Sequence, residues 1–236
     1  MMRRPWETRR RSLSEVASCR SVRIVRLLVI GCAALLCLPQ RSALAESRRL
    51  SWDFETETPG QAAVGFARIS GRWEAMQDAG NLVFAQRAEN RENVLNIALI
   101  EATSYKDLDL SVRLKPIGGE NERGGGLIWR AKDKDNFYAV RLCPYIPKHN
   151  RTKTANLRLY KMEAGRLTQL DHADAAVDDE WHTLRITMTG SQIVGYLDGR
   201  RALEAEDASN LDVGRIGLWT RSDACTSFDD LTVSAP

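Results

Sequence analysis

The sequence predicts an all-β domain, an antiparallel sandwich of two sheets with jelly-roll topology. Short runs of apolar and β-branched residues follow one another along the chain, separated by turns rich in Gly, Asn, Asp and Pro. The segment Leu108–Leu114 alternates strictly, so that four aliphatic side chains share one face and Asp109, Ser111 and Arg113 share the other. No segment carries a convincing helical stripe over about ten residues, which argues against helices.

Each apolar run between two turn signals is interpreted as one strand, and the resulting spacing is typical of a sandwich. Pro59-Gly60 and Ser70-Gly71 are examples of the turn signals. The predicted strands, in chain order, are Leu50–Phe54, Val64–Ile69, Arg72–Met76, Leu82–Ala85, Val94–Ile100, Leu108–Leu114, Leu127–Ala131, Phe137–Leu142, Leu157–Met162, Leu167–Leu170, Leu184–Thr189, Ile193–Leu197, Arg201–Glu204, Arg215–Thr220 and Thr226–Val233.

The segment Gly124–Leu142 is the central hairpin of this prediction. Three glycines allow a sharp entry or a close backbone approach, and an apolar strand follows them. Lys132–Asn136 is a polar turn, and Phe137–Leu142 is the aromatic and β-branched return strand. Farther along, Asp198-Gly199 is the strongest signal for a two-residue type I′ turn.

Residues 1–45 differ in kind from the rest of the chain and predict a cleavable signal peptide. A basic segment precedes the short apolar run Leu27–Leu38, and Ala43–Ala45 offers a small-x-small cleavage site before Glu46. A transmembrane anchor is the alternative, but this run of 12 residues is shorter than the roughly 20 that a span needs. We therefore expect an exported protein whose single domain covers residues 46–236.

Two other export routes stay open at this point. Thr8–Arg11 resembles a weak twin-arginine signal, and Val29–Cys32 resembles a lipoprotein processing site that would leave Cys32 lipidated.

The charge balance changes when the leader is removed. The whole chain has 34 basic and 31 acidic residues, and the leader holds 9 and 2 of them, which leaves 25 and 29 and a net charge of −4. A nucleic-acid partner requires a basic face on the mature chain, so the composition argues against one.

Two cysteines, Cys143 and Cys225, remain after the other three leave with the leader. In an exported chain they form either one disulfide or two separate buried thiols, and their spacing does not decide between these alternatives.

A candidate ligand surface follows from one arginine on each of four apolar strands: Arg113, Arg130, Arg141 and Arg158. If these strands are neighbours, their guanidinium groups share one face and can bind an anionic or polyhydroxylated ligand. Trp129 and Tyr138 would supply the aromatic contact for a sugar ring. The alternative is a solvated face on which the arginines pair with carboxylates such as Asp109, Glu101 or Glu163.

Carboxylates on the first and last strands are candidates for a structural Ca²⁺ site. Asp53, Glu55 and Asp229 would come together if these strands adjoin, and oxygen ligands suit Ca²⁺. The alternative is that they are ordinary turn and capping carboxylates. No other cofactor is expected, since the sequence has no phosphate loop or dinucleotide fingerprint.

Six segments carry a resemblance to a known family, and they are Thr103–Val112, Gly125–Ala131, Glu180–Leu184, Tyr196–Gly199, Gly214–Trp219 and Phe228–Asp230. Together they resemble the bacterial 3-keto-disaccharide hydrolase domain family, which belongs to the concanavalin A-like lectin/glucanase superfamily. The resemblance covers nearly all of Leu50–Val233.

The resemblance implies a sandwich whose concave sheet binds sugar. In enzymes of the family an arginine, matched here by Arg130, precedes a strand that reads Tyr-Glu-Val-Gln-Ile. This chain has Ala139 in place of the acidic residue and Arg141 in place of the amide. A carboxyl is the usual general acid or base of glycosidic chemistry, so its loss favours binding over catalysis.

Three functions are therefore carried forward. The first is an exported, carbohydrate-binding domain without robust catalysis, in the periplasm or outside a bacterial cell. The second is a hydrolase or lyase acting on 3-keto-disaccharides or related glycosides, with Asp109 or Glu101 as a substitute carboxyl. The third is a structural envelope protein with no small ligand. The oligomeric state is left open.

Overall fold

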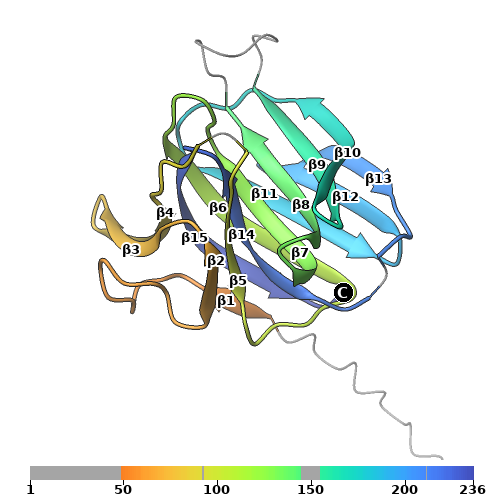
Figure 1. Ribbon diagram of the computed structural model, residues 1–236, viewed down its shortest axis with the longest axis horizontal. Coiled ribbons are helices and arrows are strands. Elements are labelled where there is room, and N and C mark those ends of the chain that lie inside the picture. Colours follow the sequence, from red (N-terminus) through yellow and green to blue (C-terminus); the bar gives the residue numbers. More distant parts are fainter. Residues whose placement is uncertain (1–48, 92, 145–154, 211) are drawn as a thin grey trace, which may run out of the picture. The chain divides into compact units, whose positions relative to one another are not determined.

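The computed structural model describes residues 49–91, 93–144, 155–210 and 212–236, and the predicted leader lies outside these ranges. Within them the chain forms fifteen β-strands and no helix. The strands build two antiparallel sheets that pack face to face (Figure 1), so the predicted all-β jelly-roll sandwich is confirmed.

The first sheet has eight strands and contains the predicted alternating segment. Its order is β13-β12-β11-β6-β15-β4-β3, and β1 pairs with β15. The strands are β1 Leu50–Trp52, β3 Trp73–Asp78, β4 Asn81–Gln86, β6 Leu108–Gly118, β11 His182–Thr189, β12 Gln192–Leu197, β13 Arg200–Glu206 and β15 Cys225–Ser234.

The second sheet has seven strands and contains the central hairpin. Its order is β10-β9-β8-β7-β14-β5-β2. The strands are β2 Phe66–Ser70, β5 Leu95–Ile100, β7 Gly125–Asp133, β8 Asn136–Cys143, β9 Asn156–Glu163, β10 Arg166–Asp174 and β14 Arg215–Arg221.

The main core lies between the two sheets. On β6, Leu108, Leu110, Val112 and Leu114 all point into it, as their alternation predicts, and each is at most 1% exposed. The residues between them face outward on the other side of the eight-stranded sheet. This alternation gives the eight-stranded sheet one apolar and one polar face, and the polar face carries the candidate site described below.

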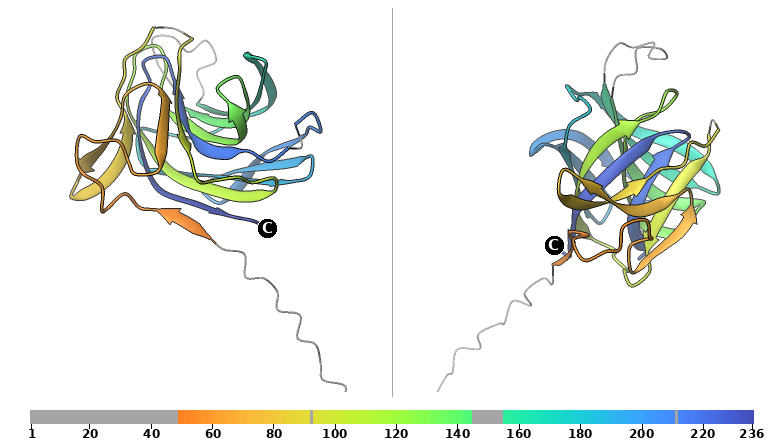
Figure 2. Two further views of the ribbon diagram at one scale, coloured as in Figure 1. Left: turned by 60° about the horizontal axis from the view of Figure 1, so that its bottom comes forward. Right: turned by 90° about the vertical axis from the view of Figure 1, so that its left-hand side faces the viewer.

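A second buried cluster lies on the outer face of the seven-stranded sheet, away from the main core. Figure 2 shows that both sheets are bent and that the seven-stranded sheet lies on the inner, concave side of the bend. Tyr160 meets Trp219 edge-on at 6.0 Å, and the Trp219 indole donates a hydrogen bond to the Val140 carbonyl at 2.9 Å. The cluster consists of Ile97, Leu99, Ile128, Ala131, Phe137, Ala139, Tyr160, Met162 and Trp219.

Most strand boundaries agree with the prediction to within a few residues, and the differences have local causes. The first strand ends at Trp52 because Phe54 adopts a φ of 59°, which turns its side chain into the core at 3% exposure. Asp198 and Gly199 both have positive φ, 47° and 78°, as the type I′ turn requires.

No helix in the described part of the chain has the length and apolar character needed to cross a membrane.

Candidate functional site

The four predicted arginines do not share one face. Arg113 lies on β6 of the eight-stranded sheet, whereas Arg130, Arg141 and Arg158 lie on β7, β8 and β9 of the other sheet. Only Arg141 and Arg158 stand directly opposite each other, on adjacent strands. The expected row of four guanidinium groups is therefore wrong, because β6 belongs to the other sheet and because Arg130 on β7 is buried.

Arg130 is a structural residue and is fully buried. Its Nε donates to the Lys106 carbonyl at 2.6 Å, Nη1 to the Asn210 carbonyl at 2.9 Å, and Nη2 to Asp107 Oδ1 and the Gly190 carbonyl at 3.2 and 2.8 Å. Burial lowers the pKa of the guanidinium. Every nitrogen of this side chain is satisfied inside the protein, so Arg130 cannot contact a ligand from solvent.

Trp129 and Tyr138 are also buried, and they stack on each other inside the main core at 5.9 Å. The Tyr138 hydroxyl donates to Asp207 Oδ1 at 2.7 Å, and burial raises the pKa of Tyr138 to about 12. Burial raises the pKa of Asp207. The hydrogen bonds that this carboxylate accepts from Ser209, Tyr138 and Lys161 outweigh burial and lower the pKa to about 2. The expectation that Trp129 and Tyr138 contact a sugar is corrected: both are core residues.

Cys143 and Cys225 are free thiols. Cys143 ends β8 and pairs in register with Asn156, whereas Cys225 begins β15 in the other sheet and pairs with Gly118. Of the two alternatives, the structure has separate thiols.

The three carboxylates proposed for Ca²⁺ each accept a hydrogen bond within the protein, and the Ca²⁺ site stays a prediction. Asp53 Oδ1 accepts from the Glu55 amide at 3.3 Å, and Glu55 Oε1 accepts from the Leu82 amide at 3.2 Å. Asp229 Oδ2 accepts from Asn81 Nδ2 at 2.9 Å. Among the residues that the structure describes, no three Asp, Glu, His or Cys side chains gather in a way that suits a metal ion.

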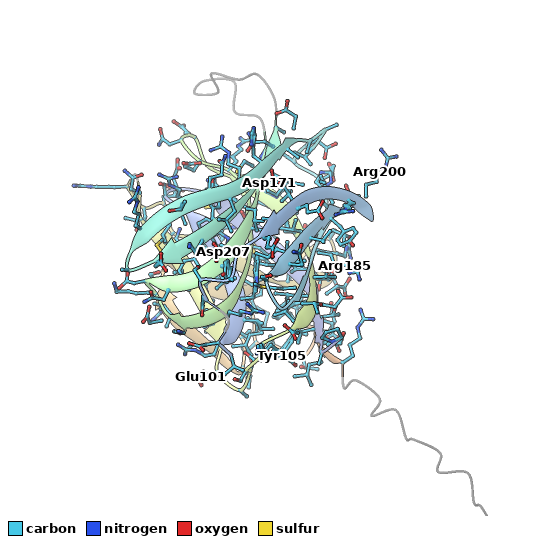
Figure 3. The ribbon with its side chains drawn as sticks, turned by 90° about the vertical axis from the view of Figure 1, so that its right-hand side faces the viewer. Glu101, Tyr105, Asp171, Arg185, Arg200 and Asp207 are labelled. Carbon is cyan, nitrogen blue, oxygen red and sulfur yellow. The ribbon has the colours of Figure 1, made fainter. Side chains whose placement is uncertain are left out.

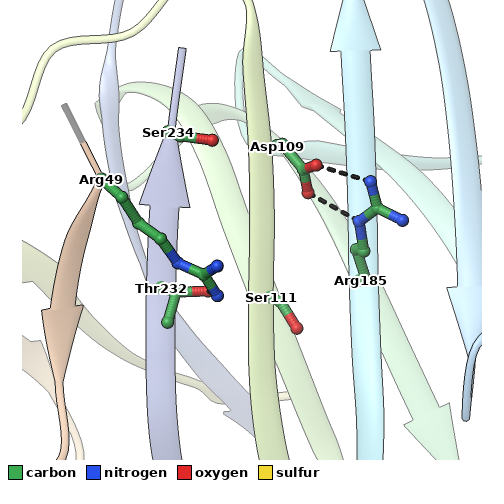
Figure 4. Close-up of a pocket in the computed structure, with 6 residues that line it drawn as sticks. All are labelled: Arg49, Asp109, Ser111, Arg185, Thr232 and Ser234. Atoms are coloured by element: carbon green, nitrogen blue, oxygen red, sulfur yellow. Dashed lines mark hydrogen bonds and ion pairs between the residues drawn. The ribbon is translucent and has the colours of Figure 1, made fainter. Parts of the chain in front are cut away.

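A polar cavity of about 270 Å³ lies on the outer face of the eight-stranded sheet (Figure 4). Strand register creates it: Thr232 of β15, Ser111 of β6, Arg185 of β11 and Tyr196 of β12 are successive partners across four strands. Because these partners face the same side, their side chains form one continuous row. The lining residues are Arg49, Asp109, Ser111, Arg185, Thr232 and Ser234.

An ion pair between Arg185 and Asp109 forms one wall of this cavity. Arg185 Nε and Nη2 donate to the two oxygens of Asp109 at 2.7 and 2.5 Å, the parallel geometry of a bidentate pair. The Asp109 carboxylate raises the pKa of Arg185. The guanidinium also lies over the Tyr196 ring, 5.0 Å from its centre, and both charged side chains remain partly exposed. The pair is therefore accessible to a ligand from solvent.

The opposite wall and the neighbouring row are also polar. Arg49 Nη2 donates to Thr232 Oγ1 at 3.1 Å. Arg113 lies two residues after Ser111 on β6. It binds Asp230 at 3.1 Å and lies over the Trp181 ring at 4.9 Å. The outer face of the eight-stranded sheet thus presents two arginine–carboxylate–aromatic groups side by side.

Of the two predicted carboxyls, the structure brings Asp109 into the cavity and leaves Glu101 outside it. Glu101 is exposed in the turn after β5, and Figure 3 shows it away from Arg185. Arg185 was absent from the predicted site, although its alternation with Leu184 and Ile186 already indicates an outward side chain. Thr232 and Ser234 alternate with Leu231 and Val233 in the same way, whereas Arg49 has no comparable signal in the sequence.

Comparison with solved structures shows the same fold. The carbohydrate binding module CBM66 from Bacillus subtilis matches at 21% identity with a TM-score of 0.60, covering 72% of this chain and 96% of that one. The GH43 protein BlXynB from Bacillus licheniformis, as a K247S mutant, matches at 12% identity with a TM-score of 0.56, covering 79% of this chain and 39% of that one.

A functionally unknown protein from Saccharomyces cerevisiae matches at 11% identity with a TM-score of 0.55, covering 75% of this chain and 99% of that one. No curated protein matches the sequence. Residues 54–234 match the 3-keto-alpha-glucoside-1,2-lyase-like domain, which confirms the family resemblance seen in the sequence. The chain therefore belongs to the family of 3-keto-alpha-glucoside-1,2-lyase-like domains.

Proposed function

We propose that this domain binds a carbohydrate in the cavity on the outer face of the eight-stranded sheet and catalyses no reaction there. Membership of a carbohydrate-related family supports the ligand class. The observation that carries the proposal is the open Arg185–Asp109 pair beside Tyr196.

The lining of the cavity suits sugar hydroxyl groups. Ser111, Thr232 and Ser234 offer hydroxyls that both donate and accept, and Asp109 keeps acceptor lone pairs beyond those that bind Arg185. Tyr196 is not among the lining residues and supports the Arg185 guanidinium, which lies over its ring. At about 270 Å³ the cavity is at the small end of ligand pockets, which supports recognition of a single sugar residue.

Three features argue against catalysis. Glycosidases use a pair of carboxyls about 5–10 Å apart, and among the described residues Asp109 is the only carboxylate that lines this cavity. Both of its oxygens accept hydrogen bonds from Arg185, so it is poorly placed to accept a proton from a substrate. At the position where the family resemblance implies an acidic residue, Ala139 is fully buried in the second cluster.

The test uses glycans found by array screening of the mature protein, with dissociation constants measured by calorimetry. Asp109→Asn and Arg185→Gln should each weaken binding roughly tenfold or more, because each removes charge-assisted hydrogen bonds. Lys132→Gln is the matched control. Lys132 lies on β7 of the other sheet, and the substitution breaks its exposed 2.6 Å ion pair with Asp212. Equal affinities for all four proteins would place the glycan elsewhere, and no binding to any glycan would favour the structural envelope role.

Hydrolysis or elimination of 3-keto-disaccharides is the second candidate, favoured by the family match and by the carboxylate of Asp109. It requires Asp109 to leave Arg185 and act as a general base. We expect no turnover of 3-keto-glucosides by the purified protein. Turnover that disappears in Asp109→Asn would replace the binding proposal with this one.

Export is part of the proposal and rests on the sequence of residues 1–45. We expect mass spectrometry of protein recovered from a bacterial host to find Glu46 as the first residue. Protein that still begins at Met1, or that carries lipid on Cys32, would contradict cleavage after Ala45.

A further inference from the structure

A group of three arginines surrounds the Cys143 thiol on the concave side of the seven-stranded sheet. Arg141 and Arg158 are register partners on β8 and β9, and Arg221 ends β14. All three act on the Cys143 thiol electrostatically, together with Glu122, although burial dominates and raises the pKa of the thiol. We call Arg141, Arg158, Arg221 and Glu122 the arginine cluster.

The arginine cluster carries an excess of positive charge. Glu122 Oε2 binds Arg141 Nη2 at 2.7 Å, and Glu122 Oε1 lies 3.5 Å from Arg221 Nε. Arg158 Nε donates to the neutral side chain of Asn156 at 2.8 Å. One carboxylate thus bridges two guanidinium groups, and the third has a neutral partner. Close guanidinium groups repel one another, so such a group is stabilised by added negative charge.

Arg141 has an unmet hydrogen-bonding requirement. The residue is 2% exposed, and within the described protein its Nε is buried without a hydrogen-bond partner. Its Nη2 binds Glu122 and the Arg123 carbonyl. Arg130 is the internal comparison: it is equally buried, yet its Nε and both terminal nitrogens are all satisfied by the protein. Arg141 thus has an unsatisfied buried donor, its Nε, whereas Arg130 has none. This difference points to a ligand group near Arg141.

Part of the arginine cluster is open to solvent. The side chains of Glu122 and Arg221 are 28% and 29% exposed, and that of Arg141 is 3% exposed. Arg158 is partly exposed as well. The cluster therefore has an accessible rim of charge around a buried guanidinium, and Glu122 occupies the place that an external carboxylate would take.

We propose that the arginine cluster binds the carboxylate of an acidic sugar, such as a uronic acid, in competition with Glu122. A planar carboxylate matches the guanidinium fork and adds the missing negative charge. This site lies on the opposite sheet from the Asp109 cavity and does not depend on it.

The experiment measures binding of D-glucuronate, D-glucose and sodium sulfate to the full-length protein by calorimetry at low ionic strength. We expect glucuronate to bind and both other compounds to bind at least roughly tenfold more weakly, since glucose has no charge and sulfate is not planar. Sulfate binding as tight as glucuronate would overturn the assignment to a sugar carboxylate.

Matched variants locate the site. Arg158→Gln should weaken glucuronate binding roughly tenfold, and Glu122→Gln should strengthen it because the competing carboxylate is gone. Lys132→Gln, whose exposed ion pair with Asp212 belongs to neither proposed site, should leave it unchanged. Unchanged affinity in Arg158→Gln, weaker binding in Glu122→Gln, or a loss in Lys132→Gln would each overturn the proposal. Arg141→Lys tests the buried donor itself: it keeps the charge, should keep the melting temperature within a few degrees, and should lose binding.

Discussion

Replacing Arg130 with methionine should lower the free energy of unfolding by about 3–5 kcal/mol. The side chain joins its own strand to three other parts of the chain, at Lys106-Asp107, Gly190 and Asn210. Methionine fills a similar volume but leaves three carbonyl groups and one carboxylate without their donor, and each buried group that loses its partner is costly. Urea unfolding followed by tryptophan fluorescence measures the change.

The control for this prediction is Arg185→Met, which removes an arginine that is 43% exposed and pairs with Asp109 at the surface. Exposed ion pairs contribute about 0–1 kcal/mol, so this variant should remain close to the parent in stability. If the two variants unfold at the same urea concentration, Arg130 does not have the structural role assigned to it.

Gly126→Ala should be the second severe change, costing about 3 kcal/mol or more. A Cβ at this position of β7 would lie 1.9 Å from the Val140 carbonyl oxygen on β8, and backbone of a paired strand cannot move aside cheaply. The same oxygen accepts the hydrogen bond from the Trp219 indole. The substitution therefore disturbs both the β7–β8 pairing and the buried cluster on the concave side.

Gly118→Ala is the matched glycine control. Its added Cβ would meet only the Cys225 Cβ, at 3.5 Å, which is an ordinary contact. We expect this variant to change stability by less than about 1 kcal/mol. Thermal unfolding of both variants under one condition compares them directly, and a Gly126→Ala protein as stable as Gly118→Ala would refute the steric argument.

The sequence was sufficient to predict the fold because period-two alternation and turn chemistry are local signals. The alternation of Leu108–Leu114 and the turn at Asp198-Gly199 each depend on a few neighbouring residues, and both are confirmed. Sheet order is not a local property. β6 pairs with β11 and β15, which are distant in the chain, and this pairing places Arg113 on a different sheet from Arg141.

The error at Arg130 has a more specific cause. Ile128 and Ala131 pack in the same outer cluster although they are three residues apart, so the alternation is interrupted between them. Arg130 adopts a φ of 47° at this point, and the register of β7 with β8 shifts after Trp129. A period-two argument assumes an unbroken strand, and nothing in the local sequence indicates the irregularity. The outward arginine of the prediction is for this reason an inward one.

The burial of Arg130 shows that the central hairpin contains both a residue that holds the fold and, at Ala139, a position that bears on chemistry. The family resemblance matches this arginine to one that enzymes of the family also have, while Ala139, on the next strand, stands where they have an acidic residue. An arginine that holds four backbone segments together serves the fold, whatever the domain binds. Position 139 can change without breaking those bonds. Relatives can thus inherit the same architecture and diverge in chemistry, and the arginine alone is no marker of activity.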